Sequence, residues 1–424
     1  MVRCRLGCGR DVPRATRLAA VSVAALLSLG IAACGSGPRT AGGSVVGNTL
    51  TVYSSLPLQG AERTNSTSIV NGEKLALQQV GGKVGDFLVK FVSLDDTGGS
   101  QAGWDPGAVL TNAREAGDDT TTIAYLGEGD SGASAVSIPI TNQAGILQVS
   151  PTSTYGGLTS SKGAQKGEAA KYYPTARRTF ARLIPNDLRQ ATAQALYQRD
   201  EGCAATYVLS DKQAYSMVLA ANTVVALGDA GVKVAGNDTI DPLAADQTQT
   251  TQKVRASGVD CVFYAGYTAD GVAGLFNALH AAVPTAKLFG SAGIAVPEFT
   301  SALDAGTQPQ TRITSPTIPA QLYSPAARAF VASYRRAFGS APSADAIYGY
   351  ASMNGVLDAI RRAGANGNDR QTVINQFFAT TSQPSVLGTY SIRPIGDTTL
   401  PYYWAYRLRG GQLVYDRTLD TQAR

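Results

Sequence analysis

The sequence predicts an α/β protein of two lobes, each a doubly wound parallel sheet, with chain segments that cross from one lobe to the other. From residue 49 onward, short β-branched runs alternate with longer helical patterns, which is the signature of βαβ units. The same alternation restarts at residue 203. The chain has 424 residues, of which 44% are hydrophobic and 16% charged, a globular composition too long for one ordinary core. Two similar lobes in tandem are therefore expected.

The first run of elements opens with the β-branched stretch "TLTVYSSLPL", which predicts a strand at 49–58. It is followed by "NSTSIVNGEKLALQQV", whose apolar spacing predicts a helix at 65–80. The remaining elements expected in this run are strands at 86–96, 120–127 and 145–150 and helices near 105–116 and 132–143. The second run is expected to hold strands at 203–211, 232–241, 259–267 and 286–293 and helices near 213–229, 246–257 and 271–282.

The last part of the chain turns helical again at 326–339 and 346–364. It finishes with strands at 388–394 and 402–416, the latter a hairpin turning at Gly410-Gly411. These late elements need both lobes to dock on, so the chain is expected to return to the first lobe and end in the second. The predicted boundaries, which make the crossing segments a hinge, are 48–184 with 320–384 for the first lobe and 185–319 with 385–424 for the second.

The N-terminus has the pattern of an export signal. An arginine-bearing stretch leads into the apolar run "LAAVSVAALLSLGIAAC" at 18–34, which has the length of a signal-peptide core. Its end, small residues before Cys34, resembles the bacterial lipobox, in which cleavage leaves a lipid-bearing cysteine. We therefore predict a signal peptide at 1–33 and a lipidated, Gly/Ser-rich tether at 34–47. The alternatives are an ordinary secretory signal or a membrane anchor.

Charge and cysteine usage exclude several functions. The net charge is +5, but residues 1–33 carry five arginines and one aspartate, so the rest is near neutral and offers no field for nucleic acid. Cys203 and Cys261 remain as one pair in the exported part, which predicts a disulfide, with two buried free thiols as the alternative. No group of residues has metal-ligand spacing, so neither a metal nor a cofactor is expected.

The stretch "YLGEGDSGAS" at 125–134 matches two chemical motifs. Its G-D-S-G would make Ser131 the nucleophile of a hydrolase, but the chain has one histidine, His280, in an apolar helical pattern at the wrong place for a base. Its G-x-G-x-x-G would suit a dinucleotide, but the motif follows the third strand and lacks the acidic residue expected downstream. We therefore predict no enzyme; an exported serine hydrolase using Ser131 is kept as a distant alternative.

The same stretch favours ligand binding at a sheet edge. The segment from Gly129 to Gly132 ends a parallel strand and opens a helix, where free N–H groups and the positive helix end attract anions, and Ser131 is placed to cap that helix or to donate to a ligand. Thr152 and Thr154 follow the next strand and add hydroxyls at that edge. Capping and turn chemistry explain these residues equally well on sequence alone.

Four segments, at 125–159, 210–220, 259–276 and 288–293, resemble the solute-binding proteins of the leucine/isoleucine/valine type, in particular their lipoprotein members. The resemblance implies the type I periplasmic-binding-protein fold, two lobes joined by three crossover strands. It implies a non-enzymatic protein that captures an amino acid or related small polar solute and hands it to a membrane ABC permease. The location implied is the outer face of the cytoplasmic membrane. A solute sensor of the same fold is the alternative.

The resemblance also implies roles for single residues. Ser131, Thr152 and Thr154 match the positions that hold the carboxylate and ammonium of the ligand, and Tyr215 and Tyr267 match the aromatic residues of the second lobe. One departure is Ala292, in "GSAG", where relatives that bind branched-chain amino acids carry a glutamate for the ammonium. A buried ammonium without a paired charge is costly.

Two explanations of this departure remain open. Another acid, such as Glu128 or Asp130, takes the place of the glutamate, or the solute has no ammonium. The tyrosines expected near the site suit a flat or apolar side chain.

Overall fold

The structure is a computed structural model that describes residues 43–98, 103–242, 244, 246–267 and 271–422. Cys34 and the predicted signal peptide lie outside the described residues. Among the described helices, none combines the length and the apolar character needed to cross a membrane.

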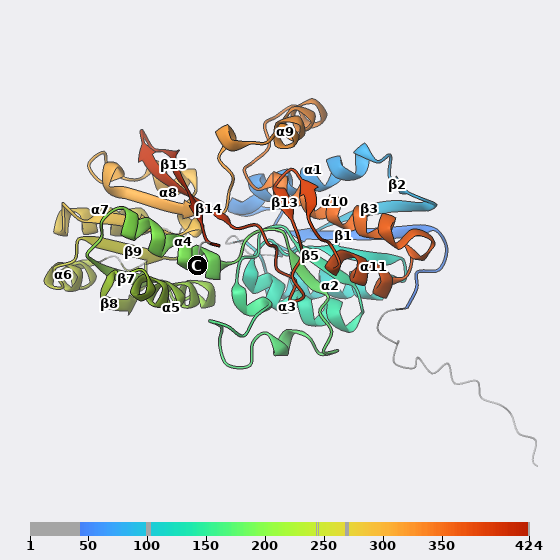
Figure 1. Cartoon of the computed structure of the whole chain (residues 1–424), viewed down its shortest axis with the longest axis horizontal. Helices are drawn as coiled ribbons and strands as arrows, with labels where there is room; N and C mark the ends of the chain where they lie inside the picture. The colour runs from blue at the N-terminus through green and yellow to red at the C-terminus, as the bar shows by residue number, and fades with distance from the viewer. Residues whose placement is uncertain (1–42, 99–102, 243, 245, 268–270, 423–424) are drawn as a thin grey trace, which may run out of the picture. The chain divides into compact units, whose positions relative to one another are not determined.

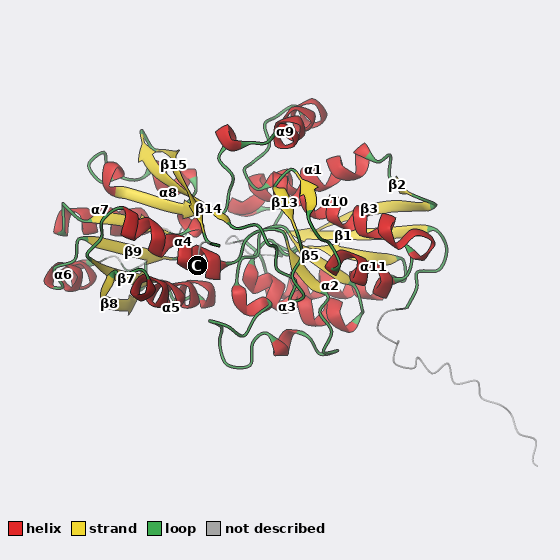
Figure 2. Cartoon of the chain, viewed as in Figure 1, coloured by secondary structure: helices red, strands yellow, loops and turns green. Residues whose placement is uncertain are grey.

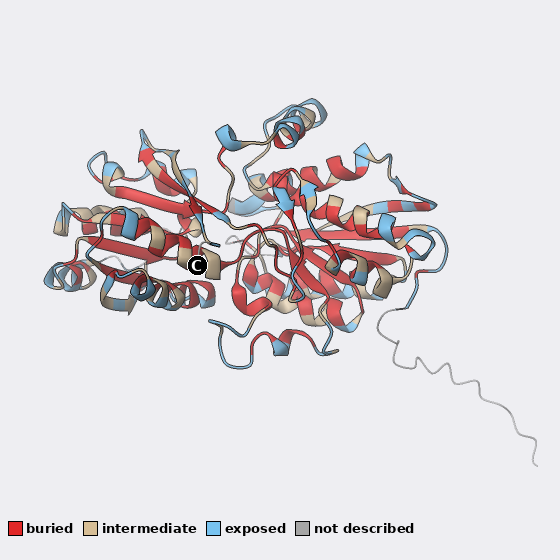
Figure 3. Ribbon diagram, viewed as in Figure 1, coloured by how far each residue is buried: buried red, intermediate tan, exposed pale blue. Residues whose placement is uncertain are grey.

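The first lobe is built on a six-stranded sheet with the order β2-β3-β1-β4-β5-β6 (Figure 1). Its strands are parallel except for β2, which pairs antiparallel with β3. The bounds are β1 (Thr49–Leu56), β2 (Lys83–Val84), β3 (Phe87–Asp95), β4 (Thr122–Leu126), β5 (Leu147–Ser150) and β6 (Phe180–Arg182). Because helices cover both faces, the inner strands β1, β4 and β5 are almost wholly buried (Figure 3).

Helices α1 (Arg63–Gln79) and α10 (Ala346–Ala363) cover one face of this sheet, where they pack on Leu50 and Val52 of β1. The two helices approach closely because Gly72 has no side chain; a Cβ there would lie 2.3 Å from the carbonyl oxygen of Ala346. Late elements complete this face: α9 (Pro325–Phe338) and α11 (Arg370–Phe378). The opposite face carries α2 (Pro106–Asp118) and α3 (Ser131–Gln143).

The second lobe contains a seven-stranded sheet with the order β15-β14-β11-β10-β9-β7-β8 (Figure 2). The C-terminal hairpin β14–β15 joins antiparallel at one edge, and the other strands are parallel. The bounds are β7 (Ala205–Ser210), β8 (Lys233–Thr239), β9 (Cys261–Ala265), β10 (Lys287–Gly290), β11 (Thr311–Ser315), β14 (Tyr402–Arg409) and β15 (Gln412–Asp420).

Two helix layers enclose this sheet as well. On one face lie α4 (Asp187–Asp200) and α5 (Ala214–Asp229); on the other lie α6 (Thr248–Ala256), α7 (Val272–Ala282) and the short α8 (Pro297–Ser301). Strand residues alternate between the two layers, with Val208 facing α4 and α5 and Tyr207 facing the other layer.

Two features fasten the second lobe at the N-terminal ends of its strands. Cys203 and Cys261 form a disulfide with a Cα–Cα distance of 5.9 Å, which joins the chain just before β7 to the start of β9. Glu201, at the end of α4, accepts hydrogen bonds from three arginines that belong to different strands: Arg312, Arg407 and Arg417. This ion cluster ties the C-terminal hairpin to the rest of the lobe.

The chain passes between the lobes three times, after β6, after β11 and before β14, as the doubly wound two-lobe prediction requires. The first and third passages lie side by side, since Arg182 N donates to Gly396 O. The predicted boundary at residue 385 is too early. The hairpin β12 (Gln383–Ser385) and β13 (Gly388–Tyr390) and the segment up to Leu400 pack in the first-lobe core.

The predicted α/β fold class is confirmed, with parallel-dominated sheets in both lobes. Four elements were not predicted from the sequence. Three of them, β6, α4 and α11, carry the first passage between lobes and part of the first-lobe core. The fourth is β11, the strand of the second sheet from which the second passage leaves.

Candidate functional site

The first-lobe residues singled out in the sequence meet at one edge of the sheet. Ser131 and Gly132 begin α3 directly after β4, and Thr152 and Thr154 follow β5. Since β4 and β5 are paired and parallel, their carboxyl ends lie next to each other. This edge is where open α/β sheets bind ligands.

The hydroxyl of Ser131 links the two loops at this edge. Its Oγ accepts a hydrogen bond from the backbone N of Tyr155 at 3.1 Å, and the side chain is buried. Asp130 is the N-cap residue of α3, but its carboxylate makes no hydrogen bond to the helix. The first N–H groups of α3 are therefore not capped by this side chain, and they can receive a ligand carboxylate.

The neighbouring residues shape the same edge. Thr152 is half-buried and its hydroxyl donates to the carbonyl of Gly129 at 2.9 Å, so this side chain braces the loop before α3. Thr154 is also half-buried, and its carbonyl accepts from the backbone N of Asp187 at 2.9 Å. Gly132 lies under Trp104: a Cβ at position 132 would come within 2.6 Å of its indole ring.

Two tyrosines of the second lobe form the other part of the candidate site. Tyr215, in the first turn of α5, is buried and donates to Gln190 Oε1 at 3.0 Å. Tyr267 follows β9, and its ring centroid lies 4.9 Å from that of Tyr215. The backbone N of Tyr267 donates to Asp211 Oδ2, which fixes the turn that carries the ring. The pair presents aromatic surface with phenolic oxygens.

Residues of both lobes face the same region. Burial raises the pKa of Tyr267 well above its ordinary value, and the charges of Asp130, Asp211 and Asp187 raise it further. Since Asp130 belongs to the first lobe and acts on the pKa of Tyr267, its carboxylate lies within electrostatic reach of the second-lobe tyrosine pair. Beside this region the lobes touch directly, because Val218 of α5 packs in the same cluster as Ile138 of α3.

The segment with the missing glutamate lies against the tyrosine pair. Ser291 follows β10, and its buried hydroxyl donates to the carbonyl of Gly266 and accepts from its N–H. Gly293 faces Tyr267, since a Cβ there would lie 3.1 Å from the Cδ1 atom of the ring. Between them, Ala292 is half-buried and carries no charge.

Of the two acids considered as substitutes, Glu128 belongs to the interior of the first lobe. It is fully buried, accepts from the Tyr125 hydroxyl at 2.6 Å, and burial together with the nearby Asp96 raises its pKa well above the usual range. Asp130 is half-buried, and burial, helped by the charges of Glu62 and Asp96, raises its pKa to about 7. Asp130 is therefore the one of the two that faces the second lobe.

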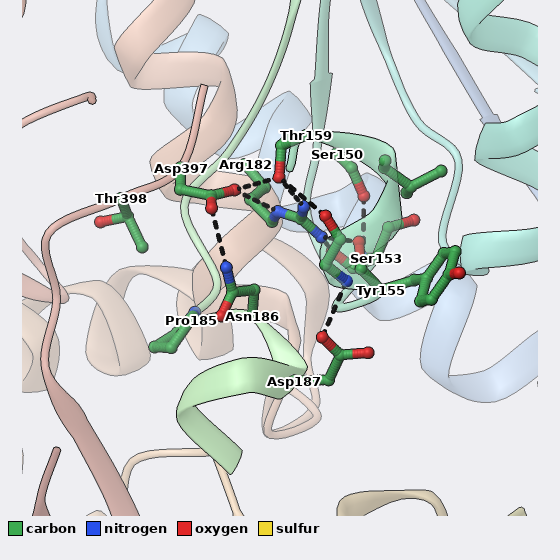
Figure 4. A network of polar contacts seen from close by, with 12 residues as sticks. Ser150, Ser153, Tyr155, Thr159, Arg182, Pro185, Asn186, Asp187, Asp397 and Thr398 are labelled. Carbon is green, nitrogen blue, oxygen red and sulfur yellow. Dashed lines mark hydrogen bonds and ion pairs between the residues drawn. The ribbon is translucent and has the colours of Figure 1, made fainter. Parts of the chain in front are cut away.

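Arg182 organises the loop that carries Thr154 and Tyr155 (Figure 4). Its side chain is completely buried at the end of β6; Nε donates to Asp397 Oδ1 at 2.9 Å, and Nη1 donates to the carbonyls of Ser153 and Tyr155 at 2.9 and 2.8 Å. Asp397 also accepts from Asn186 at 2.7 Å. This network joins the first and third passages between lobes to the loop that carries Thr154 and Tyr155.

Arg182, Asp187 and Asp397 were not predicted from the sequence as site residues. A local signal was available for Asp187, because Asn186 directly before it has the residue type of a helix N-cap. In the structure Asn186 caps α4 by accepting from Arg189 N at 3.3 Å. The partners of Arg182 lie up to 215 residues away in the sequence, so no local pattern marks it.

The hydrolase alternative requires a histidine base beside Ser131, and the one histidine of the sequence lies elsewhere in the described part of the chain. His280 sits on α7 of the second lobe, where it borders Gly306, and the Ser131 hydroxyl is engaged with Tyr155 N.

Comparisons with known proteins bear on the family and the fold of the chain. The periplasmic binding protein family matches residues 51–412. The chain is 24% identical over 381 residues to the Leu/Ile/Val-binding protein BraC3 of Rhizobium johnstonii, covering 84% of this chain and 91% of that protein. Among solved structures, the leucine binding protein LivK of Thermotoga maritima has a TM-score of 0.73 at 20% identity, covering 88% of this chain and 99% of that one.

A second solved structure shows that ligands differ among proteins of this fold. It is a solute binding protein of Rhodopseudomonas palustris in complex with p-hydroxybenzoic acid, with a TM-score of 0.72 at 15% identity, covering 88% of this chain and 96% of that one. The relative and the two neighbours are all binding proteins for amino acids or other small solutes. Because the family match spans most of the sequence, the chain belongs to the periplasmic binding protein family.

Proposed function

We propose that this protein captures a small solute between its two lobes and delivers it to an ABC permease. The observation that carries the proposal is the meeting of three features: the Ser131 hydroxyl, the start of α3 without a side-chain cap, and the tyrosine pair of the second lobe. The first two supply donors for a carboxylate, and the third supplies aromatic surface. Solute binding at such a site fits the known activity of the relatives.

In this proposal, binding selects a closed arrangement of the lobes. The solute docks first on the loops that hold Ser131, Thr152 and Thr154, and Tyr215 and Tyr267 then close over it. A ligand shifts such an equilibrium only if it contacts both lobes in one state and one lobe in the other. The three passages between lobes act as the hinge, and the Arg182 network keeps the first and third passages together while they bend.

The proposal is tested by thermal unfolding of residues 35–424 with a panel of amino acids, amides, urea derivatives and aromatic acids. A ligand at a hundredfold excess over its Kd stabilises the folded state by about 2.7 kcal/mol. Ser131→Ala should abolish this gain. Ser137→Ala is the matched control, because Ser137 lies on the same helix but pairs with Gln148 inside the lobe. If no compound in the panel stabilises the protein, the proposal is refuted.

We further propose that Cys34 anchors the protein to the outer face of the cytoplasmic membrane through a covalent lipid. The support is the apolar run before Cys34 and the flexible stretch after it. The full chain should incorporate labelled palmitate and sediment with membranes. Cys34→Ser should lose the label; a variant that keeps it would refute the lipid assignment. Capture of the permease by the anchored, solute-loaded protein would test delivery.

A further inference from the structure

Asp187 is a buried acid with half of its hydrogen-bonding capacity unused. It is the first residue of α4, and its side chain is fully buried. One oxygen, Oδ1, accepts from the backbone N of Gly156 at 2.7 Å. The other, Oδ2, is buried without a hydrogen-bond partner among the described residues. Leaving a buried charged acceptor unpaired costs free energy, so such an atom calls for a partner.

The neighbouring cation does not supply that partner. Arg182 acts on Asp187 electrostatically, but its own donors are taken by Asp397, by two carbonyls and by Thr159. In spite of Arg182, burial raises the pKa of Asp187 to about 7. Figure 4 shows the second oxygen of Asp187 pointing away from the Arg182 network.

Asp187 lies within the candidate site. Its backbone N donates to the carbonyl of Thr154, on the ligand-facing loop of the first lobe. Its charge raises the pKa of Tyr215 and of Tyr267, the aromatic pair of the second lobe. Asp187 is therefore bonded to the first-lobe loop at Thr154 and Gly156 and acts electrostatically on the tyrosine pair of the second lobe. Asp130 adds a second carboxylate near Tyr267.

We propose that the free oxygen of Asp187 accepts hydrogen bonds from a protonated amine of the solute. Asp187 would thereby take the role of the glutamate that is replaced by alanine at position 292. This inference rests on the proposed function and narrows the solute to amino-acid-like zwitterions. The carboxylate of the solute would meet Ser131 and the start of α3, and its amine would meet Asp187. A solute with a carboxylate alone would leave the buried oxygen unpaired and bring a second negative charge beside it.

The experiment is isothermal titration of residues 35–424 with matched pairs of solutes that differ in the amine. The pairs are leucine with 4-methylpentanoate and phenylalanine with 3-phenylpropionate, and benzoate is added as an aromatic acid. We expect one amino acid of the set to bind and its amine-free partner to bind at least about tenfold more weakly, the size of one charged hydrogen bond.

Asp187→Asn tests the residue itself. Asparagine keeps an acceptor for Gly156 N but loses the charge, so the amino acid should bind about 10- to 100-fold more weakly. Asp345→Asn is the control, since Asp345 is another desolvated acid but is engaged with Asn65. Unliganded Asp187→Asn should unfold at the same or a higher temperature at pH 8, because it no longer buries a charge. A purely structural role would lower that temperature.

The outcomes separate the two proposals. Equal binding of an amino acid and its amine-free partner, or unchanged affinity in Asp187→Asn, overturns the inference and leaves the proposed function standing. Binding of benzoate alone does the same. If none of the compounds in this set or in the wider panel binds, the proposed function fails and the inference fails with it.

Discussion

Arg182→Met is the substitution whose effect can be worked out most fully from the structure. Arg182 is completely buried and makes four hydrogen bonds, to Asp397, Ser153, Tyr155 and Thr159. Methionine fills a similar volume, but it leaves the buried Asp397 carboxylate with only two neutral hydrogen-bond donors, Thr159 and Asn186. Breaking a buried ion pair from one side typically costs about 3–5 kcal/mol. We therefore expect a loss of about 4 kcal/mol in the free energy of unfolding.

The same change should weaken solute binding. The loop at 153–159 loses the donors that hold two of its carbonyls, so part of the binding free energy must be spent on ordering it again. Urea unfolding gives the stability, and titration with the solute found in the panel gives the affinity. Arg189→Met is the control, because Arg189 is half-buried at the same passage and its side chain bonds to Thr421; it should cost less than about 1 kcal/mol.

A double variant separates the ion pair from the loop contacts. Arg182→Met with Asp397→Leu removes both charges, so it should recover much of the lost stability while the affinity stays low. The reasoning is refuted if Arg182→Met unfolds within 1 kcal/mol of the unsubstituted protein, or if the single variant binds solute with unchanged affinity.

Three further predictions concern stability. Burial raises the pKa of Glu73 on α1 to about 8, so the folded state holds a proton that the unfolded chain releases near pH 4.5. The free energy of unfolding should therefore fall as the pH rises from 4.5 to 8. Urea unfolding at pH 5 and at pH 8.5 should show that this fall is about 3–5 kcal/mol smaller in Glu73→Gln than in the unsubstituted protein. Cys203→Ser opens a loop with a sequence separation of 58, which should cost about 4 kcal/mol; reductant should destabilise the unsubstituted protein and leave the variant unaffected. Arginines hold the pKa of Glu201 below its ordinary value in spite of burial, so its contribution should be present at pH 7 and lost as the pH falls through that lowered pKa; Glu201→Gln should cost about 2–4 kcal/mol at pH 7 and progressively less as the pH is lowered below the ordinary glutamate pKa, and an equal loss at every pH would contradict this.

The alternation of strands and helices was readable because each element has a strong local period. The helix expected at 213–229 is observed at Ala214–Asp229, and the strand expected at 49–58 at Thr49–Leu56. Helix α4 escaped because its buried residues mix polar side chains with small apolar ones. It buries Gln190, Gln194 and Gln198 among alanines, so no strong apolar stripe marks it. Strand β6 has three residues, too few for a period.

For the candidate site, too, the positions of some residues could be predicted from the sequence, whereas their contacts could not. Ser131, Gly132, Thr152 and Thr154 could be selected because they follow strands, and parallel strands bring their carboxyl ends to one edge. The hydrogen-bond partners of each side chain could not be predicted from the sequence. Thr152 turned out to brace the loop before α3, and Glu128, considered as a ligand for an ammonium, lies inside the lobe.

What the sequence by itself determined is the class of the protein: two α/β lobes, the chain order that connects them, an N-terminal stretch with the pattern of an export signal, and the sheet edge at which we expect a ligand. These follow from local periodicity and spacing, which neighbouring residues set. Only the tertiary structure decided which acid faces the tyrosine pair and which cation is already occupied. The Arg182–Asp397 pair spans 215 residues, and the free oxygen of Asp187 is defined by what surrounds it. Burial and hydrogen-bond saturation are properties of packing, and packing depends on contacts between distant parts of the chain.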